Sequence, residues 1–297
     1  MSLLDKRMRI DLAERLNGDD ISAARDISVA IKDNISTKGL PSYFFGNRDA
    51  QAVVVNLNPG ESADKCDNAW TEKINGFETS LDSFIEKYVY RQINYGLEYG
   101  VVNGKADSFD VKQAAFLTPW VDSGIGLSTN PDWSSEEYRM EAKTKVICNK
   151  LQLELVPYAS AKFDIVKGNI TLFRPFVETL LDEIFSKERR YIIFASAKFE
   201  DIFKDYNEEC PNTFDFINED ITPDALKAGG TLKGRCSVIR ITYKGRVCNA
   251  LIAHTFPNQG LSKAYNLMQK YGEFCYNAYM NSENNTKING ECRKSKE

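Results

Sequence analysis

The C-terminal half of the chain alternates short apolar runs with amphipathic helical patterns, and this order limits the folds open to it. Residues 171–188 place apolar side chains on one face at 3.6-residue spacing, which is typical of a helix packed on a core. Apolar runs of strand length stand before and after it, at 151–158 and 190–196. Because parallel neighbouring strands need crossover connections, this order predicts a parallel sheet with helices on both faces.

A further buried strand is predicted at 50–60, where "AQAVVVNLNPG" is a short β-branched run bounded by a Pro-Gly pair. Asn58 precedes a proline, which favours extended backbone and holds the strand geometry up to the residue that presents its amide. Gly60 would then let the backbone turn sharply and approach a ligand closely. The alternative is an Asn-Pro-Gly turn that only ends a strand.

The remaining segments give a provisional division of the chain. Helical patterns interrupted at Asn17-Gly18 predict an N-terminal helical extension over 1–40, followed by an α/β domain over 41–280. Within that domain, 61–150 is interpreted as an insertion that shapes one wall of a site. A hairpin ends at His254 and leads through a loop to a closing helix, and the polar tail 281–297 is expected to be disordered.

Composition excludes several classes of protein. No stretch approaches the roughly 20 apolar residues of a membrane helix, and the charged N-terminus is unlike a signal peptide, so a cytoplasmic protein is expected. The seven cysteines form no C-x-x-C pair, and neither a zinc site nor an iron–sulfur cluster is indicated. We therefore expect a monomer with no metal and no cofactor.

The charge distribution is more informative than the net charge of −4, which does not indicate a nucleic-acid-binding protein. Between residues 225 and 246 there are six basic residues and no acidic one: Lys227, Lys233, Arg235, Arg240, Lys244 and Arg246. This basic segment could contact phosphates, or it could be a solvated hairpin, since charge runs are commonly surface features.

His254 is the only histidine in the chain, and it follows the last predicted strand. In parallel sheets ligands bind at the carboxyl ends of the strands, and Asn58 and His254 both occupy such ends. A lone histidine after a strand is more often a hydrogen-bonded structural residue than a catalyst. The pairing of His254 with Asn58, in this topology, favours a functional site.

These residues resemble the uracil-DNA glycosylase superfamily. Its first motif, a strand followed by an N-P-G turn, stands here as "NLNPG" at 56–60, and its last motif, a strand followed by a histidine and a loop, stands as "HTFPNQGLS" at 254–262. The strand and helix patterns between them match in order, over about 45–275. The resemblance implies a four-stranded parallel sheet sandwiched by helices, and a DNA glycosylase that acts without a cofactor on a base flipped out of DNA.

The resemblance also implies roles for individual residues. Asn58 would position the attacking water, and His254 would donate a hydrogen bond to the pyrimidine O2, an interaction worth roughly 2.7–4 kcal/mol in comparable anion sites. The base must leave the stack to reach these groups. Residues implied to bind the substrate are Asn56, Pro59, Gly60, Glu154, Tyr158 and Ser196. Residues implied to bind DNA are Thr255, Asn258, Gln259, Leu261 and Ser262, with Arg240, Lys244 and Arg246 of the basic segment.

The sequence departs from the family on its second strand, where Glu154 or Tyr158 stands near the place of the uracil-reading asparagine. A bulkier or more polar modified pyrimidine, including a hypermodified phage base, would suit that change. Candidates for the aromatic side chain that stacks on the base are Tyr158, Trp120 and Phe77.

Two alternatives remain open: a catalytically inactive nucleic-acid-binding or phage-defence protein on the same fold, and a nucleotide-binding α/β enzyme. The second is disfavoured because the glycine-rich phosphate-binding loops are missing from the sequence.

Overall fold

The computed structural model describes residues 1–32, 34–60, 80–98, 101–102, 105–106, 108–120, 131–160, 170–222, 234–254 and 265–294. Within these ranges the helices are α1 (Leu3–Leu16), α2 (Ser22–Ile31), α4 (Leu81–Glu98), α5 (Ser108–Leu117), α6 (Glu136–Asn149), α7 (Ile170–Phe185), α8 (Lys198–Glu209) and α9 (Tyr265–Lys294). The strands are β1 (Phe44–Gly46), β2 (Ala52–Asn56), β3 (Val101–Val102), β4 (Lys105–Ala106), β5 (Lys150–Glu154), β6 (Tyr191–Phe194), β7 (Phe214–Ile221), β8 (Cys236–Tyr243) and β9 (Arg246–Ala253).

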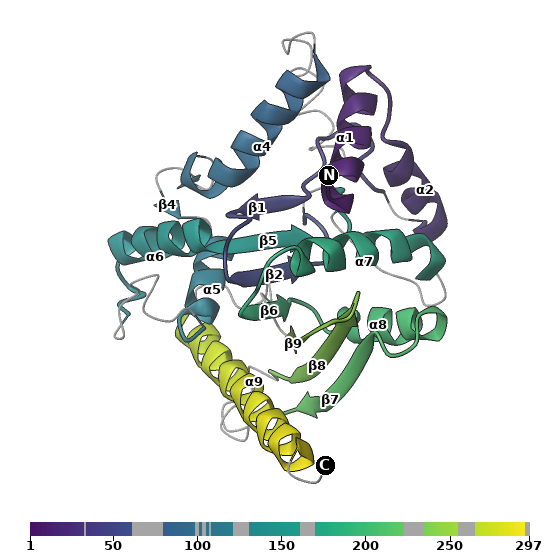
Figure 1. The fold of residues 1–297 in the computed structure, drawn as a ribbon. Coiled ribbons are helices and arrows are strands. Elements are labelled where there is room, and N and C mark those ends of the chain that lie inside the picture. The colour runs from purple at the N-terminus through teal and green to yellow at the C-terminus, as the bar shows by residue number, and fades with distance from the viewer. Residues whose placement is uncertain are drawn as a thin grey trace.

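One mixed sheet of seven strands, in the order β1-β5-β2-β6-β9-β8-β7, forms the centre of the protein (Figure 1). The four strands that carry the resemblance, β5, β2, β6 and β9, pair in parallel with one another. The predicted α/β class is confirmed, and the predicted four-stranded parallel sheet is matched only in part, because the sheet has seven strands and is mixed. Strand β1 adds antiparallel beside β5, and β8 and β7 add antiparallel beyond β9.

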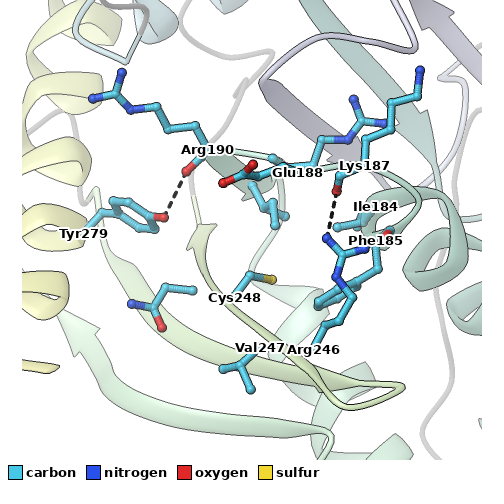
Figure 2. A pocket seen from close by; sticks show the side chains of 12 residues that line it. Ile184, Phe185, Lys187, Glu188, Arg190, Arg246, Val247, Cys248 and Tyr279 are labelled. Atoms are coloured by element: carbon cyan, nitrogen blue, oxygen red, sulfur yellow. Dashed lines mark hydrogen bonds between the residues drawn. The ribbon is translucent and has the colours of Figure 1, made fainter. Parts of the chain in front are cut away.

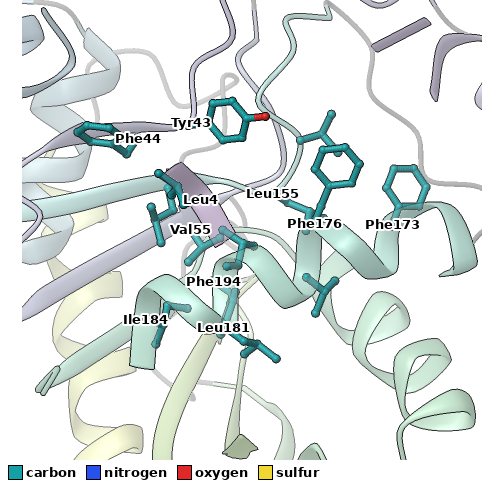
Figure 3. Packing of buried hydrophobic residues seen from close by; sticks show 14 of the residues in the cluster. Leu4, Tyr43, Phe44, Val55, Leu155, Phe173, Phe176, Leu181, Ile184 and Phe194 are labelled. Atoms are coloured by element: carbon teal, nitrogen blue, oxygen red, sulfur yellow. The ribbon is translucent and has the colours of Figure 1, made fainter. Parts of the chain in front are cut away.

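Two hydrophobic clusters cover the two faces of the sheet, because alternate side chains of each strand point to opposite faces. On one face, α1, α2, α7 and α8 pack over residues such as Val55 and Phe194. Figure 3 shows Leu181 and Ile184 of α7 beside those two strand residues. On the other face, α5, α6 and α9 pack over Val54 and its neighbours.

The N-terminal helices are part of this core. Leu4, Met8 and Leu12 of α1 are buried in the same cluster as the strand residues, which follows from their helical spacing on one face. The segment 61–150, expected to shape a wall of the site, supplies α5 and α6, which cover one face of the sheet. The same segment also supplies α4.

Helix α9 crosses α5 closely and extends beyond the expected end of the domain. A Cβ atom at Gly272 would overlap the backbone carbonyl of Phe116, so only glycine fits at this crossing. A disordered tail was expected from residue 281, but the structure continues α9 to Lys294. Part of the reason is Ser282, a buried residue that accepts a hydrogen bond of 2.9 Å from Asn218 on β7.

The outer strands of the sheet are irregular. Strand β7 pairs with β8 through two register shifts, at Phe216/Asn218 and Asn218/Ile221. Asp220, between these shifts, has a positive φ of 51°. At the opposite end of the sheet, β1 has only three residues.

No helix in the described ranges is both long enough and apolar enough to cross a membrane.

Candidate functional site

The carboxyl ends of the four parallel strands lie in one row, which we call the carboxyl edge of the sheet, and the candidate site lies there. Strand β2 ends at Asn56 and β9 at Ala253, with β6 between them, so Asn58 and His254 follow strands that are two positions apart. With strands about 4.8 Å apart, this separates the two chain segments by about 10 Å. The carboxyl ends of parallel strands are where such sheets bind ligands.

The Asn58 side chain is fixed by backbone groups on both sides of the turn. Its Nδ2 donates to the carbonyl oxygens of Pro59, at 3.0 Å, and of Ser160, at 3.2 Å. The Ser160 N–H in turn donates to the Pro59 carbonyl at 3.1 Å, which ties the turn to the chain beyond β5. Among the described residues Oδ1 of Asn58 has no hydrogen-bond partner. The amide nitrogen is therefore held in place, and within the described ranges the amide oxygen is left to accept another hydrogen bond.

The role expected for Gly60 is not supported by its surroundings. A Cβ atom there would meet nothing within 4 Å, and the residue is exposed with no left-handed φ. Pro59 is half-buried in the same turn. The sharp turn and close approach that were expected of a glycine at this position are thus not required by the described neighbours.

Behind the turn, five polar side chains form a continuous buried polar chain. Glu154 Oε1 accepts from Asn56 Nδ2 at 3.1 Å and from Gln152 Nε2 at 2.8 Å. Gln152 Oε1 accepts from Lys150 Nζ at 2.9 Å and from Gln113 Nε2 of α5 at 3.0 Å. Lys150 also donates to Gln113 Oε1. A lysine and a glutamate are thereby linked inside the protein through two glutamines.

Burial shifts the pKa values at both ends of this chain. Removal from water raises the pKa of Glu154 to about 7 and lowers the pKa of Lys150 to about 8. Glu154 Oε2 is buried and has no hydrogen-bond partner among the described residues. The arrangement costs folding free energy, because burial disfavours the charged form of each of the two groups.

We expect the Glu154→Gln variant to lose one component of the pH dependence of stability. The folded-state pKa of about 7 lies above the usual 4.5, so the native protein binds the extra proton between these pH values. The contribution of Glu154 to the free energy of unfolding is therefore fully present below pH 4.5 and is lost as the pH rises through 7. The loss is about 3 kcal/mol, from 1.36 kcal/mol per pKa unit.

Urea unfolding of both proteins at pH values from 4 to 8 measures this difference. Asp11 has its pKa raised to about 6 by burial and titrates in the same window, but it is present in both proteins and cancels in the comparison. Parallel stability curves for the two proteins would show that Glu154 is ionised at its ordinary pKa, and would contradict the prediction.

His254 is held by a carboxylate on α8. Its Nε2 lies 2.7 Å from Oε1 of Glu200, in the first turn of that helix, and 3.4 Å from the hydroxyl of Ser237 on β8. Since an ionised carboxylate only accepts hydrogen bonds, Nε2 is the donor. Nδ1 is 3.9 Å from Oδ1 of Asp220, beyond hydrogen-bond distance. The imidazole side chain is 11% exposed, so its orientation is set by these neighbours.

Ser237, His254 and Asp220 do not form a nucleophilic triad. The Ser237 hydroxyl donates to Glu200 and accepts from the Asp220 N–H at 3.0 Å, and the residue is fully buried. A serine nucleophile must donate to the histidine and reach the substrate. Ser237 instead stabilises the pair formed by His254 and Glu200.

Two residues expected to bind the substrate have structural partners. Tyr158 is 1% exposed, and its hydroxyl donates to Asp11 of α1 at 2.7 Å, so it belongs to the core. The Ser196 hydroxyl accepts from the Lys198 N–H at 3.2 Å, where α8 begins. Of the aromatic candidates for stacking, Trp120 is fully buried among aromatic rings.

Several expected residues lie outside the described ranges. They are Phe77, the two basic residues Lys227 and Lys233, and the DNA-binding candidates Thr255, Asn258, Gln259, Leu261 and Ser262.

Of the four described residues of the basic segment, Arg235 lies beside the site, since its carbonyl accepts from the His254 N–H at 3.2 Å, whereas Lys244 and Arg246 lie away from it. Arg246 starts β9 and His254 follows its end, so the eight residues of the strand separate them by about 25 Å. Lys244 is paired with Asp182 at 2.7 Å, and Arg240 lies 3.9 Å from Asp215. DNA binding by these residues stays a prediction. Lys244 and Arg246 lie at the end of the β8–β9 hairpin opposite to the site, and Arg240 lies midway along it, paired with Asn249.

A cavity of about 280 Å³ lies beside Arg246. Figure 2 shows Arg246 directed toward the turn after α7, where it donates to the Phe185 carbonyl, and Tyr279 of α9 donating to the Arg190 carbonyl at 3.1 Å. The two donors fasten the turn between α7 and β6 to β9 and α9. The cavity lies beside the first residues of β9, whereas His254 follows the last one, so the cavity is separate from the site.

Sequence reasoning did not identify Glu200, Ser237, Lys150 or the two glutamines. For the polar chain a signal was present: "KLQLE" puts Lys150, Gln152 and Glu154 on one face of a strand that is otherwise apolar. Nothing local marks Glu200 as a partner of His254, because the two residues are far apart in the sequence.

In the described part of the chain, no cluster of three or more histidine, cysteine or acidic side chains could hold a metal ion. A scan against protein-family models finds no match, and searches of curated proteins and of solved structures find none either.

Proposed function

We propose that this protein is a DNA glycosylase that hydrolyses the N-glycosidic bond of a flipped-out uracil or modified pyrimidine and leaves an abasic site. The observation that carries the proposal is the fixed Asn58 amide, with its Oδ1 acceptor available, two strands from His254 at the carboxyl edge of a parallel sheet. The resemblance of the Asn58 and His254 motifs to the uracil-DNA glycosylase superfamily supports the same function.

The proposed reaction needs one protein group on each side of the N-glycosidic bond: Asn58 on the side of the sugar and His254 on the side of the base. Asn58 Oδ1 accepts a hydrogen bond from a water molecule and orients its oxygen toward C1′ of the sugar. The bond from C1′ to the base nitrogen breaks with its electron pair moving to the base, and a bond forms between C1′ and the water oxygen. The water gives up a proton to solvent, and the departing base gains one.

His254 stabilises the negative charge that develops on the base. Because Nε2 already donates to Glu200, Nδ1 is the ring atom that can donate to a base oxygen. A donor aimed at that oxygen acts mainly in the transition state, where the negative charge on the base is largest.

The test of this function is the release of bases from a panel of DNAs that includes uracil-containing DNA and phage DNAs with modified pyrimidines. We expect mass spectrometry to find a free base and an equal amount of abasic sites. Asn58→Ala should slow the release about 10²-fold or more while DNA binding is retained, because water positioning acts in the transition state.

Asn249→Ala serves as the matched control, since Asn249 is a half-buried asparagine on β9 beside the cavity next to Arg246. It should release bases at the normal rate. Normal turnover by Asn58→Ala would mean that the Asn-Pro-Gly turn is structural.

One observation favours the second candidate, a nucleic-acid-binding or phage-defence protein without glycosidase activity. His254 Nε2 is already bound to Glu200, as in a histidine that serves the fold. DNA binding without abasic sites, from every DNA of the panel, would select this candidate.

A further inference from the structure

Within the described ranges, one fully buried atom of the polar chain lacks a hydrogen-bond partner, and it belongs to Glu154. Its Oε1 accepts two hydrogen bonds, whereas Oε2 is buried with no partner among the described residues. The residue as a whole is 4% exposed. Leaving a buried acceptor unpaired is unfavourable, and more so for a charged one. A ligand that donates a hydrogen bond to Oε2 would remove this cost.

Glu154 stands at the end of a strand that borders the proposed site. Glu154 is the last residue of β5 and pairs in register with Asn56, the last residue of β2. The two chains stay joined beyond the strands, since the Leu155 N–H donates to the Asn56 carbonyl at 2.8 Å and Asn58 donates to Ser160. The unpaired oxygen thus belongs to the side chain next to the turn that presents Asn58.

The chemistry of the chain indicates what kind of group Oε2 would bind. Lys150 provides a positive charge, relayed to Glu154 through Gln152, which favours the ionised carboxylate. A carboxylate oxygen accepts hydrogen bonds and repels another acceptor. An amino group on a base would donate a hydrogen bond to Oε2. A keto oxygen at the same ring position is itself an acceptor, so it would be repelled by the carboxylate oxygen.

We infer that Glu154 accepts a hydrogen bond from an exocyclic amino group of the base, so that the site selects an amino-bearing pyrimidine of the cytosine type over a uracil-type base. This inference rests on the proposed function for the identity of the ligand as a flipped base. The inference concerns which base the site binds, through the side chain of Glu154, and it does not depend on cleavage of the glycosidic bond.

The test measures binding rather than cleavage. Fluorescence anisotropy would compare single-stranded oligonucleotides that carry one uncleavable 2′-fluoro analogue of deoxycytidine or of deoxyuridine, at pH 8, with an all-thymidine oligonucleotide as the control. We expect the wild-type protein to bind the cytosine analogue about tenfold or more tightly than the uracil analogue, the effect of one hydrogen bond to a charged group. In Glu154→Gln the amide oxygen takes the place of Oε1, which accepts from Asn56 and Gln152, so the amide nitrogen stands at the position of Oε2 and can only donate. This variant should lose the preference for the cytosine analogue or prefer the uracil analogue.

A second measurement uses only the wild-type protein, in case the variant does not fold. At pH 6 most Glu154 carboxyls are protonated, given the pKa of about 7, and a protonated Oε2 can donate to a keto oxygen. Lys150, the charged group that acts on Glu154, is fully charged at pH 6 and about half charged at pH 8, given its pKa of about 8, so the carboxyl of Glu154 is the group that changes most between the two pH values. The preference for the cytosine analogue should therefore shrink or reverse between pH 8 and pH 6.

Each result bears on this inference separately from the proposed function. Equal binding of the two analogues at pH 8, a preference for uracil at pH 8, or a preference that is unchanged at pH 6 would overturn it. A cytosine preference that depends on Glu154 would support it even if no DNA of the panel yields abasic sites, in which case only the glycosylase proposal fails.

Discussion

Replacing His254 by alanine is expected to lower the single-turnover rate of base release by about 10²–10³-fold. The lost group is one donor aimed at the charge that develops on the base, and such donors act mainly in the transition state. Affinity for DNA that carries an uncleavable analogue should change little. Rapid-quench measurement of abasic sites, with anisotropy for affinity, separates the two effects.

Two further variants distinguish a catalytic from a structural histidine. His254→Gln retains a donor and should recover part of the rate. Glu200→Gln keeps a hydrogen-bonding partner at 2.7 Å from the ring but removes the negative charge, so it should lower the rate without unfolding the protein. If the alanine variant instead loses melting temperature, and its rate falls only in proportion to the folded fraction, His254 serves the fold.

Because the chain has a single histidine, its NMR signal needs no assignment by mutagenesis. The titration of that signal can be compared directly with the pH dependence of cleavage.

Gly272→Leu is expected to destabilise the protein by about 4 kcal/mol or more, at the severe end of overpacking effects. Its Cβ would overlap the carbonyl of Phe116, and a backbone atom in a packed helix cannot move aside as a side-chain end can. Leucine is the better helix former by roughly 0.8 kcal/mol, so a loss can only come from the crossing of α5 and α9. Chemical denaturation of the purified protein measures the change.

The matched control places the same side chain elsewhere on α9. Asn277 is exposed in that helix, and Asn277→Leu should leave the stability within about 0.5 kcal/mol of the wild type. Equal losses at both positions would show that leucine disturbs α9 itself, rather than its packing on α5.

The central elements could be predicted because each one has a strong periodic pattern. The β-branched run before Asn58, the amphipathic helix α7 and the hairpin that ends before His254 were all expected, and all are present. The outer strands could not be predicted. Strand β1 is too short to show any period in its apolar residues. Strand β7 has two shifts of register and several acidic residues, so its sequence does not alternate regularly between apolar and polar residues. Their existence depends on partners that are distant in the sequence.

The candidate site likewise has a part that could be predicted from the sequence and a part that could not. Asn58 and His254 could be placed at one edge because strand direction alone puts them there. Their hydrogen-bond partners could not be foreseen: Ser160 and Glu200 come from other segments and meet them only through the tertiary fold. Tyr158 illustrates the opposite error, since its place in the sequence suggested the pocket while its hydroxyl binds Asp11 in the core.

The irregular outer strands bear on how this protein behaves at high concentration. A regular outer strand offers a row of free N–H and C=O groups to which a second molecule can add its own strand, the first step of many aggregates. Here the row is interrupted by the two register shifts of β7 and by the positive φ of Asp220, while β1 offers only three residues. We expect concentrated solutions to resist fibril formation, and straightening β7 by replacing Asp220 with a β-branched residue to weaken that resistance.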